Sequence, residues 1–458
     1  MPSHPFDFEI QSDLFSTPEM TAIFSERQRF TRWLGFEAAL AEAQAELGII
    51  PREAAQEIAT KANLDCLDLE AVRKAYRQSR NSLMPLINGL RRACVAPHGE
   101  YTHYGATTQD VIDTSQVLEL RDTFRIIYRD LRKAEEFLLL LAQRHCATPM
   151  LGRTHGQQAL PITFGLKCSV WLAELRRHIE RVKSLMPRIS AGQLSGAVGT
   201  YAALGHDGRE IAKRTLAKLG LSSAPVSWHN SRDNMAEAAT LMAMISTTLE
   251  KIASEIFELG KNEVGELFEP APPGKASSST MPHKRNPVIC QRIAVLARQA
   301  RALSATVVES MLHEHERDGR ALWSEWLAMP QISVYTGTAL NYSLSLISGL
   351  GVNSERMLKN LRCQGESLLS EWLQFRLAAR MGKMRAQEKL STIIAESHET
   401  GMSVRDCLRN DQETAAILSE EDYTFMEYPE KYTGLAESII RDQVADLFRR
   451  RNLEPCEL

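Results

Sequence analysis

The sequence lacks paired cysteines, an excess of charge of one sign and long apolar runs. Its eight cysteines stand singly, and without a Cys-x-x-Cys spacing they support neither a zinc ribbon nor a dithiol redox site. The net charge of -3 gives no electrostatic argument for binding nucleic acid or an acidic membrane surface. Apolar runs such as 137–142 are too short to cross a bilayer, and the first residues do not resemble a secretory signal. We therefore expect a cytoplasmic protein without a membrane or nucleic-acid partner.

Helical periodicity is present along most of the chain. A helix is expected over 25–47, where Trp33, Leu40 and Leu47 are seven positions apart. Longer helices are expected over 114–144, 162–186, 234–261, 287–312 and 329–350. Because alternating β-branched runs are scarce, we predict an all-α fold in three regions: an N-terminal helical domain over 1–113, a central long-helix bundle over 114–353, and a C-terminal helical domain over 354–458. Helices about twice the average length usually build an extended bundle, which here is expected to form a subunit interface.

One polar loop stands out at 277–287, which reads Ser-Ser-Ser-Thr-Met-Pro-His-Lys-Arg-Asn-Pro. Three prolines and a glycine within 269–275 exclude regular structure just before it, and Pro287 suits the first turn of a following helix. Hydroxyls and cations in a loop that leads into a helix N-terminus suit the capture of an anion. The alternative is a solvated Ser/Pro linker, although linkers seldom carry Met-Pro-His-Lys-Arg-Asn-Pro in one run.

A second polar segment, His-Tyr-Gly-Ala-Thr-Thr-Gln-Asp, occupies 103–110. The hydroxyls of Thr107 and Thr108 could donate hydrogen bonds to a carboxylate, and Asp110 could hold a neighbouring base. The same residue types also cap helices, so this alternative stays open. A third segment at 153–158 places His155 between small polar residues, where a near-neutral pKa suits proton transfer to a leaving group. The alternative is a buried histidine that only completes the packing.

Two further segments offer charged side chains. Arg232, in the polar turn at 228–234, could bind a substrate carboxylate bidentately, or the neighbouring Asp233 and Asn234 could simply cap a helix. The segment 313–318 reads His-Glu-His-Glu-Arg-Asp, but it lacks the His-Glu-x-x-His spacing that puts two histidines on one helical face. We therefore expect no metal site there, and a solvated helix end is the alternative interpretation.

The loop at 278–287 resembles the signature of the fumarase/aspartase superfamily, Gly-Ser-Ser-x-Met-Pro-x-Lys-x-Asn, with Ser277 in the place of the usual glycine. The segment at 103–110 resembles a second family block, His-x-Gly-x-Thr-(Thr/Ser)-x-Asp, and 153–158 resembles a block of the adenylosuccinate lyases. The resemblance covers nearly the whole chain. It implies a homotetramer of three-region all-α subunits, in which each active site draws on three subunits.

The resemblance also implies an enzyme that catalyses anti β-elimination, or the reverse addition, next to a carboxylate of a small polycarboxylate, without a cofactor. It implies that Ser278 is the base, that His155 is the acid, and that His103 helps to orient or bind the substrate. Lys284 would stabilise the dianionic aci-carboxylate intermediate. The implied substrate contacts are Thr107, Thr108, Asp110, Arg153, Thr154, Gln157, Arg232, Ser279, Met281, Asn286 and Arg317.

Within the superfamily, the arm at 14–20 and the segments 104–113, 228–234, 323–326 and 431–436 resemble 3-carboxy-cis,cis-muconate cycloisomerases. Adenylosuccinate lyases carry an Arg-Tyr pair for the nucleotide phosphate where Leu14 and Phe15 stand, and these two side chains offer no charge-assisted donor. His155, in contrast, is typical of adenylosuccinate lyases. We expect a cycloisomerase-like enzyme. The alternatives are a C–N lyase that releases fumarate from an N-substituted aspartate and, remotely, a non-catalytic structural protein.

Overall fold

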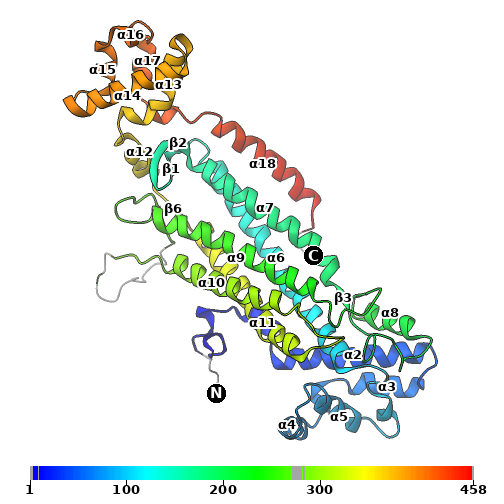
Figure 1. Cartoon of the computed structure of the whole chain (residues 1–458). Coiled ribbons are helices and arrows are strands. Elements are labelled where there is room, and N and C mark those ends of the chain that lie inside the picture. The colour runs from blue at the N-terminus through cyan, green and yellow to red at the C-terminus, as the bar shows by residue number, and fades with distance from the viewer. Residues whose placement is uncertain (1–3, 9, 271–280, 282–283, 456–457) are drawn as a thin grey trace.

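The computed structural model describes residues 4–8, 10–270, 281, 284–455 and 458. Helices make up most of this part of the chain, and its strands form three two-stranded ladders. The all-α fold predicted from the periodicity is confirmed. Long helices form an elongated bundle, with a group of shorter helices at each end (Figure 1).

Five long helices build the central bundle. They are α6 (Thr108–Arg144), α7 (Phe164–Ile189), α9 (Asp233–Leu259), α10 (Val288–Glu309) and α11 (Gly319–Ser348). Their inward faces carry Leu, Ile, Ala and Met at helical spacing, and these side chains merge into one continuous core. All five helices overlap the segments in which the periodicity predicts them.

Two of these helices start earlier than expected, and in both cases a polar cap explains the start. Thr107 and Asp110 form a capping box, so α6 begins at Thr108 rather than near residue 114. The Asp318 side chain accepts the backbone N–H of Arg320, so α11 begins at Gly319 and Pro330 lies within the helix. The capping alternative for the threonine and aspartate segment is therefore correct for Thr107 and Asp110.

Shorter helices pack at the end of the bundle where α6 begins (Figure 1). The short helix α1 (Pro18–Ile23) packs mainly on α6 and α11. The helices of the end group are α2 (Glu26–Glu46), α3 (Arg52–Lys61), α4 (Leu69–Gln78), α5 (Met84–Ala93) and α8 (Gly208–Lys218). Their apolar faces form a second core that includes Trp33, Leu86 and Ile112. Although α8 lies far along the chain, Ile211 and Ala212 belong to this core as well.

The other end of the bundle carries α12 (Ser354–Arg362) and a small helical group with its own core. This group comprises α13 (Ser370–Met381), α14 (Lys383–Thr400), α15 (Val404–Asn410), α16 (Gln412–Ala415) and α17 (Glu420–Phe425). The last helix, α18 (Ala436–Leu453), returns along the bundle and packs on α7 and α6. Glu454, directly after it, forms ion pairs with Arg132, Arg176 and Lys183.

The main strand pair is the antiparallel hairpin β1 (Pro149–Thr154) and β2 (Gln157–Thr163), which joins α6 to α7. The short strands β5 (Leu267–Phe268) and β6 (Gly351–Val352) pair close to it, and β3 (Ala191–Gly192) pairs with β4 (Ser222–Ser223). These ladders tie together segments that enter and leave the long helices.

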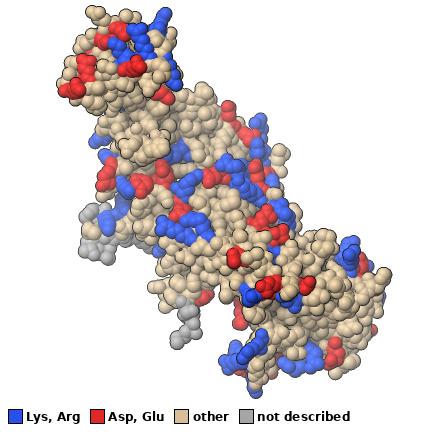
Figure 2. Space-filling model, viewed as in Figure 1, with Lys and Arg blue, Asp and Glu red and all other residues tan. Residues whose placement is uncertain are grey.

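Basic and acidic side chains are interspersed over the visible face of the bundle, without a large patch of one sign (Figure 2). Among the described helices, none combines the length and the apolar composition that crossing a membrane requires.

Candidate active site

The carboxylate of Asp110 fixes the polar segment at the start of α6. It is fully buried and accepts backbone N–H groups from Thr107 at 3.0 Å, Ser195 at 3.0 Å and Gly196 at 3.1 Å. His229 Nε2 lies 3.0 Å from its Oδ1. These contacts hold the segment around Gly196 and the turn at His229 against α6. The geometry favours a positioning role for Asp110, and direct contact with a substrate stays a prediction.

His103 lies beside this helix start and is oriented by Glu37 of α2. Its Nδ1 is 2.7 Å from Glu37 Oε1, and the carboxylate is almost completely buried. Burial alone would lower the pKa of His103, but the charge and hydrogen bond of Glu37 and the nearby Asp110 outweigh it and raise that pKa. The other ring nitrogen, Nε2, is the one left to face a ligand. His103 also has a φ of 60°, in the left-handed region that few residues other than glycine adopt.

The segment before α11 reaches the same place. Arg317 Nη2 donates to the carbonyl of Ala197 at 2.9 Å and lies 3.5 Å from Thr107 Oγ1. Arg317 is exposed, so its guanidinium can meet an anion that approaches from solvent. The carbonyl of His315 accepts from Asn230 Nδ2 at 2.6 Å, which fastens this segment to the turn before α9. The structure thus brings His103, Thr107, Thr108, Asp110 and Arg317 together.

Arg232 lies next to this cluster but is completely buried. Its Nε donates to Glu325 Oε2 at 3.0 Å, its Nη2 pairs with the other oxygen of Glu325, and its Nη1 lies 2.9 Å from Asp113 Oδ2. Burial alone would lower the pKa of Arg232, but the two carboxylates raise it; burial raises the pKa of Asp113. The bidentate pair expected with a substrate forms here with Glu325, so the geometry favours a role in joining α6, α9 and α11.

His155 lies at the opposite end of α6, at the tip of the β1–β2 hairpin. His155 and Gly156 form its two-residue turn, and both have positive φ, 52° and 75°, as a type I′ turn requires. Thr154, His155 and Gln157 are exposed, so the alternative of a buried packing histidine is wrong. Arg153 anchors the hairpin through two hydrogen bonds to Glu266, at 2.8 Å and 3.1 Å.

The polar segment 277–287, called the cationic loop below, leads into α10, and its described residues 284–287 lie at this same end of the molecule. Ser278 and Ser279 lie outside the described residues. Met281 and Lys284 are exposed, and Asn286 lies shortly before α10. The Glu269 carboxylate accepts the N–H groups of Ile289 at 3.0 Å and Cys290 at 2.6 Å, so it occupies the N-terminus of α10.

The length of α6 separates the candidate groups within one chain. A helix of 37 residues is about 55 Å long, with the His103 cluster at its start and the His155 hairpin beyond its end. Figure 1 shows the hairpin and the α2 region at opposite ends of the bundle. One copy of the chain therefore cannot bring His155 and His103 to the same small molecule.

Several acidic side chains that organise the site were not identified from the sequence. Glu37, Glu266 and Glu325 pair with His103, Arg153 and Arg232 across 66, 113 and 93 positions of the chain. No local motif marks these carboxylates. Among the described residues, no group of three or more His, Cys, Asp or Glu side chains could hold a metal ion.

Comparison with known proteins adds a second line of evidence. Residues 15–302 match the family model described as lyase. The chain is 43% identical to an N-acetyl-S-(2-succino)cysteine lyase of Dickeya dadantii over 84% of this chain and 85% of that protein. It is 38% identical to an adenylosuccinate lyase of Methanothermobacter thermautotrophicus over 96% of this chain and 98% of that protein.

The fold has a close match among solved structures. The 3-carboxy-cis,cis-muconate lactonizing enzyme from Pseudomonas putida superimposes with a TM-score of 0.89 at 33% identity, over 96% of this chain and 99% of that chain. Sequence and fold therefore agree along almost the whole length. The chain belongs to the lyase family of the fumarate lyase superfamily.

Proposed function

We propose that this enzyme cleaves the C–S bond of a small S-(2-succinyl) thiol compound and releases fumarate. The observation that carries this choice is the 43% identity to a lyase named for N-acetyl-S-(2-succino)cysteine. The proposal replaces the cycloisomerase preferred from the sequence, which becomes the second candidate. Both reactions need a base, an acid and groups that stabilise a dianion next to a carboxylate.

In the proposed reaction, Ser278 removes a proton from the CH2 group next to one carboxylate. The electron pair forms the C=C bond of fumarate, the C–S bond breaks, and the sulfur takes a proton from His155. Lys284 and Asn286 stabilise the dianion that develops after proton removal. A serine hydroxyl is a weak base, so the cationic loop must also stabilise its alkoxide. His103 and Thr107 bind or orient the substrate at the start of α6.

The active unit is proposed to be a homotetramer, because the groups are too far apart in one chain. The hairpin of one subunit and the cationic loop of another would meet the His103 cluster of a third. The exposed tip that carries His155 and the exposed Arg317 suit such a shared site. The division of the chain into regions 1–113, 114–353 and 354–458 belongs to the same proposal.

The test is a paired product assay with N-acetyl-S-(2-succino)cysteine. Purified enzyme should produce fumarate, measured by ultraviolet absorbance, and free thiol, measured with a thiol reagent, in equal amounts. Neither product should form without enzyme. Absence of both products at high enzyme concentration would overturn the proposal.

The second candidate, a 3-carboxy-cis,cis-muconate cycloisomerase, is favoured by the TM-score of 0.89 with the enzyme from Pseudomonas putida. Loss of the diene absorbance of 3-carboxy-cis,cis-muconate would support it. An adenylosuccinate lyase is less well supported, because Leu14 and Phe15 provide no charge-assisted donor for a phosphate. Fumarate release from adenylosuccinate would test that alternative with the same assay.

A further inference from the structure

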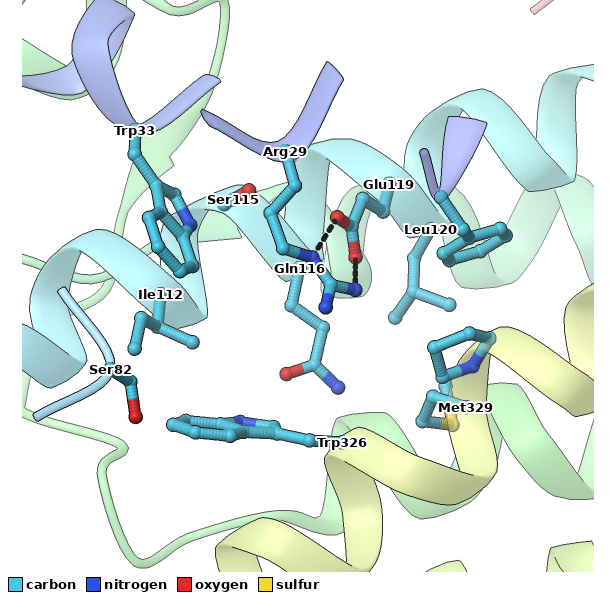
Figure 3. Close-up of a pocket in the computed structure, with 12 residues that line it drawn as sticks. Arg29, Trp33, Ser82, Ile112, Ser115, Gln116, Glu119, Leu120, Trp326 and Met329 are labelled. Carbon is cyan, nitrogen blue, oxygen red and sulfur yellow. Dashed lines mark hydrogen bonds and ion pairs between the residues drawn. The ribbon is translucent and has the colours of Figure 1, made fainter. Parts of the chain in front are cut away.

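A cavity of about 190 Å³ lies between α2, α6 and α11, beside the His103 cluster. Figure 3 shows Trp33 and Trp326 on two sides of it, with the Gln116 side chain extending between them. Ile112, Leu120 and Met329 supply much of the apolar wall. A cavity of about 150 Å³ can hold a ligand of the size of benzene, so this one has room for a small organic group.

The cavity lies about one helical turn from the His103 cluster, along both α2 and α6. On α2, Trp33 precedes Glu37, the partner of His103, by four positions. On α6, Ile112 follows Thr108 by four positions. Residues four apart lie on the same helical face, about 6 Å from each other. The cavity is therefore the next layer between the same two helices that hold the His103 cluster.

Four polar atoms of the lining side chains are buried and find no hydrogen-bond partner among the described residues. They are Trp33 Nε1, Ser115 Oγ, Gln116 Oε1 and Trp326 Nε1. Trp33, Ser115 and Gln116 are each at least nine-tenths buried. Buried polar groups are nearly always paired in a folded protein, so these four atoms mark the polar part of the cavity lining, which the polar group of a ligand would complete.

The orientation of Gln116 defines what its oxygen can accept. Its Nε2 donates to Glu325 Oε1 at 2.8 Å, and because a carboxylate only accepts, the amide cannot be turned around. Gln116 Oε1 is therefore an acceptor for an N–H group, whereas the two indoles are donors for a carbonyl oxygen. One ligand group that offers both a carbonyl oxygen and an N–H is a secondary amide.

The two charged side chains that line the cavity, Arg29 and Glu119, form an ion pair with each other. Arg29 donates two hydrogen bonds to Glu119, at 3.0 Å and 3.2 Å (Figure 3). This bidentate pair leaves no strong field that would attract a phosphate or an ammonium group. The cavity therefore favours a neutral polar group with some apolar surface.

We propose that this cavity binds the acylamino group of the leaving thiol, and that Trp33 and Trp326 select acylated over free-amine substrates. The inference rests on the proposed function, since it assigns a site to one part of that substrate. The carbonyl oxygen accepts from an indole N–H, and the amide N–H donates to Gln116 Oε1. A free amine would instead bring an unpaired ammonium into a neutral cavity, which is unfavourable.

The test compares N-acetyl-S-(2-succino)cysteine with S-(2-succino)cysteine in four proteins: wild type, Trp33→Phe, Trp326→Phe and Trp323→Phe. Phenylalanine keeps an aromatic ring but removes the N–H donor. Trp323 lies on the same helix, is 59% exposed and does not line the cavity, so it is the matched control. Each cavity variant should lower kcat/KM for the acylated substrate by about three- to tenfold. The free-amine substrate should change by less than about twofold, and the control should change neither.

Binding of N-acetyl-L-cysteine alone, followed by calorimetry under reducing conditions, provides a readout that needs no turnover. Wild type should bind it more tightly than Trp33→Phe and Trp326→Phe by a similar factor. If wild type cleaves neither substrate but this difference in binding remains, the proposed function fails and the acylamino site stands. Equal loss of activity on both substrates, or no binding of N-acetyl-L-cysteine by wild type, overturns the inference.

Discussion

Strained histidines mark the places where the site is built. Among the described residues, four that are not glycine have positive φ, and they are His103, His155, Tyr201 and His315. A left-handed conformation costs about 1–2 kcal/mol for such residues and persists only where the surroundings impose it. The hydrogen bond to Glu37 helps to hold the backbone of His103 in this conformation, and the two-residue turn of the hairpin holds that of His155. The side chains are thereby directed to positions that a relaxed backbone would not give.

The Glu37–His103 pair predicts a pH-dependent stability. The folded-state pKa of His103 is raised, so its contribution is fully present below the unfolded pKa of about 6.5 and is lost as pH rises through the folded pKa. Glu37→Gln should therefore destabilise the protein by about 2 kcal/mol near pH 6 and by less near pH 9. Urea unfolding at both pH values measures this. Glu42→Gln, on the same helix, removes a half-exposed carboxylate that pairs with Lys218 and is the control. An equal loss at both pH values would contradict the assignment.

In our proposal Ser278 is the base, so Ser278→Ala should remove proton abstraction. Turnover should fall at least about a hundredfold, the scale of losing a proton-transfer group. The loss should be similar for thioether and amine substrates, since both require the same proton removal. Steady-state kinetics with each substrate measures this, and Ser277→Ala is the neighbouring control. A loss below tenfold would assign the base elsewhere.

His155→Gln should lower kcat more for a substrate with an amine leaving group than for one with a thiol leaving group. A thiolate has a conjugate-acid pKa of about 8.5 and can leave with little help, whereas an amine needs protonation before it leaves. The variant should therefore lose about tenfold on a succinyl thioether and at least about a hundredfold on a succinyl amine. Comparison of kcat for matched substrates measures the difference. Equal losses on both substrates would indicate that His155 only binds the substrate.

At the scale of elements, the β1–β2 hairpin is rigid because polar groups tie it to the bundle. Glu266 is fully buried and accepts two hydrogen bonds from Arg153 and one from Asn360 at 2.8 Å. The carbonyl of Glu266 also accepts the N–H of Asn353 at 2.9 Å. The end of β1 next to the turn, the segment after α9 and the start of α12 are thus fixed together, and this contact lies directly beside the turn that carries His155.

Glu266→Gln is expected to loosen this support. Removing one partner of a buried ion pair costs about 3 kcal/mol, so the urea midpoint should fall and turnover should fall with it. Glu258→Gln is a suitable control, because its pair with Lys261 is about half exposed and should be worth less than about 1 kcal/mol. Unchanged stability of Glu266→Gln would mean that the hairpin is held by its strand pairing alone.

Local sequence predicts the elements better than it predicts the contacts of the site. The helix expected over 25–47 is found at Glu26–Glu46, because apolar spacing and a Ser25 cap are local signals. The loop signature and the segments at 103–110 and 153–158 were also visible as motifs, but the β hairpin that carries His155 was not predicted. Arg232 was not predictable in this way: its buried pairing depends on Asp113 and Glu325, which only the packing of three helices brings near.

At the scale of the whole molecule, the length of α6 determines how the candidate groups can meet. The His103 cluster and the His155 hairpin lie at opposite ends of this helix, which is about 55 Å long, so in our proposal a complete site combines several copies of the chain. Closed symmetric assemblies repeat one such shared site at every equivalent position. The bundle between the two ends then acts as a spacer that sets where the groups of neighbouring copies come together.

This arrangement predicts complementation between two impaired variants. Ser278→Ala and His155→Gln each lack one group, and in our proposal the two groups of one site come from different subunits. Mixed assemblies then contain sites whose serine comes from the His155→Gln chain and whose histidine comes from the Ser278→Ala chain. With random mixing in equal amounts, about a quarter of the sites are complete, since each requirement is met half of the time.

The two variants should be unfolded and refolded together, or co-expressed with different tags, so that subunits exchange. Activity should recover to about a quarter of the wild-type value. Refolding each variant alone should give no recovery, which controls for reactivation by the procedure itself. If both groups of a site came from one chain, no mixed assembly could contain a complete site, because every chain carries one of the two substitutions. Activity that stays at the level of the separate variants, in assemblies shown by their tags to be mixed, would therefore place the serine and the histidine on the same subunit.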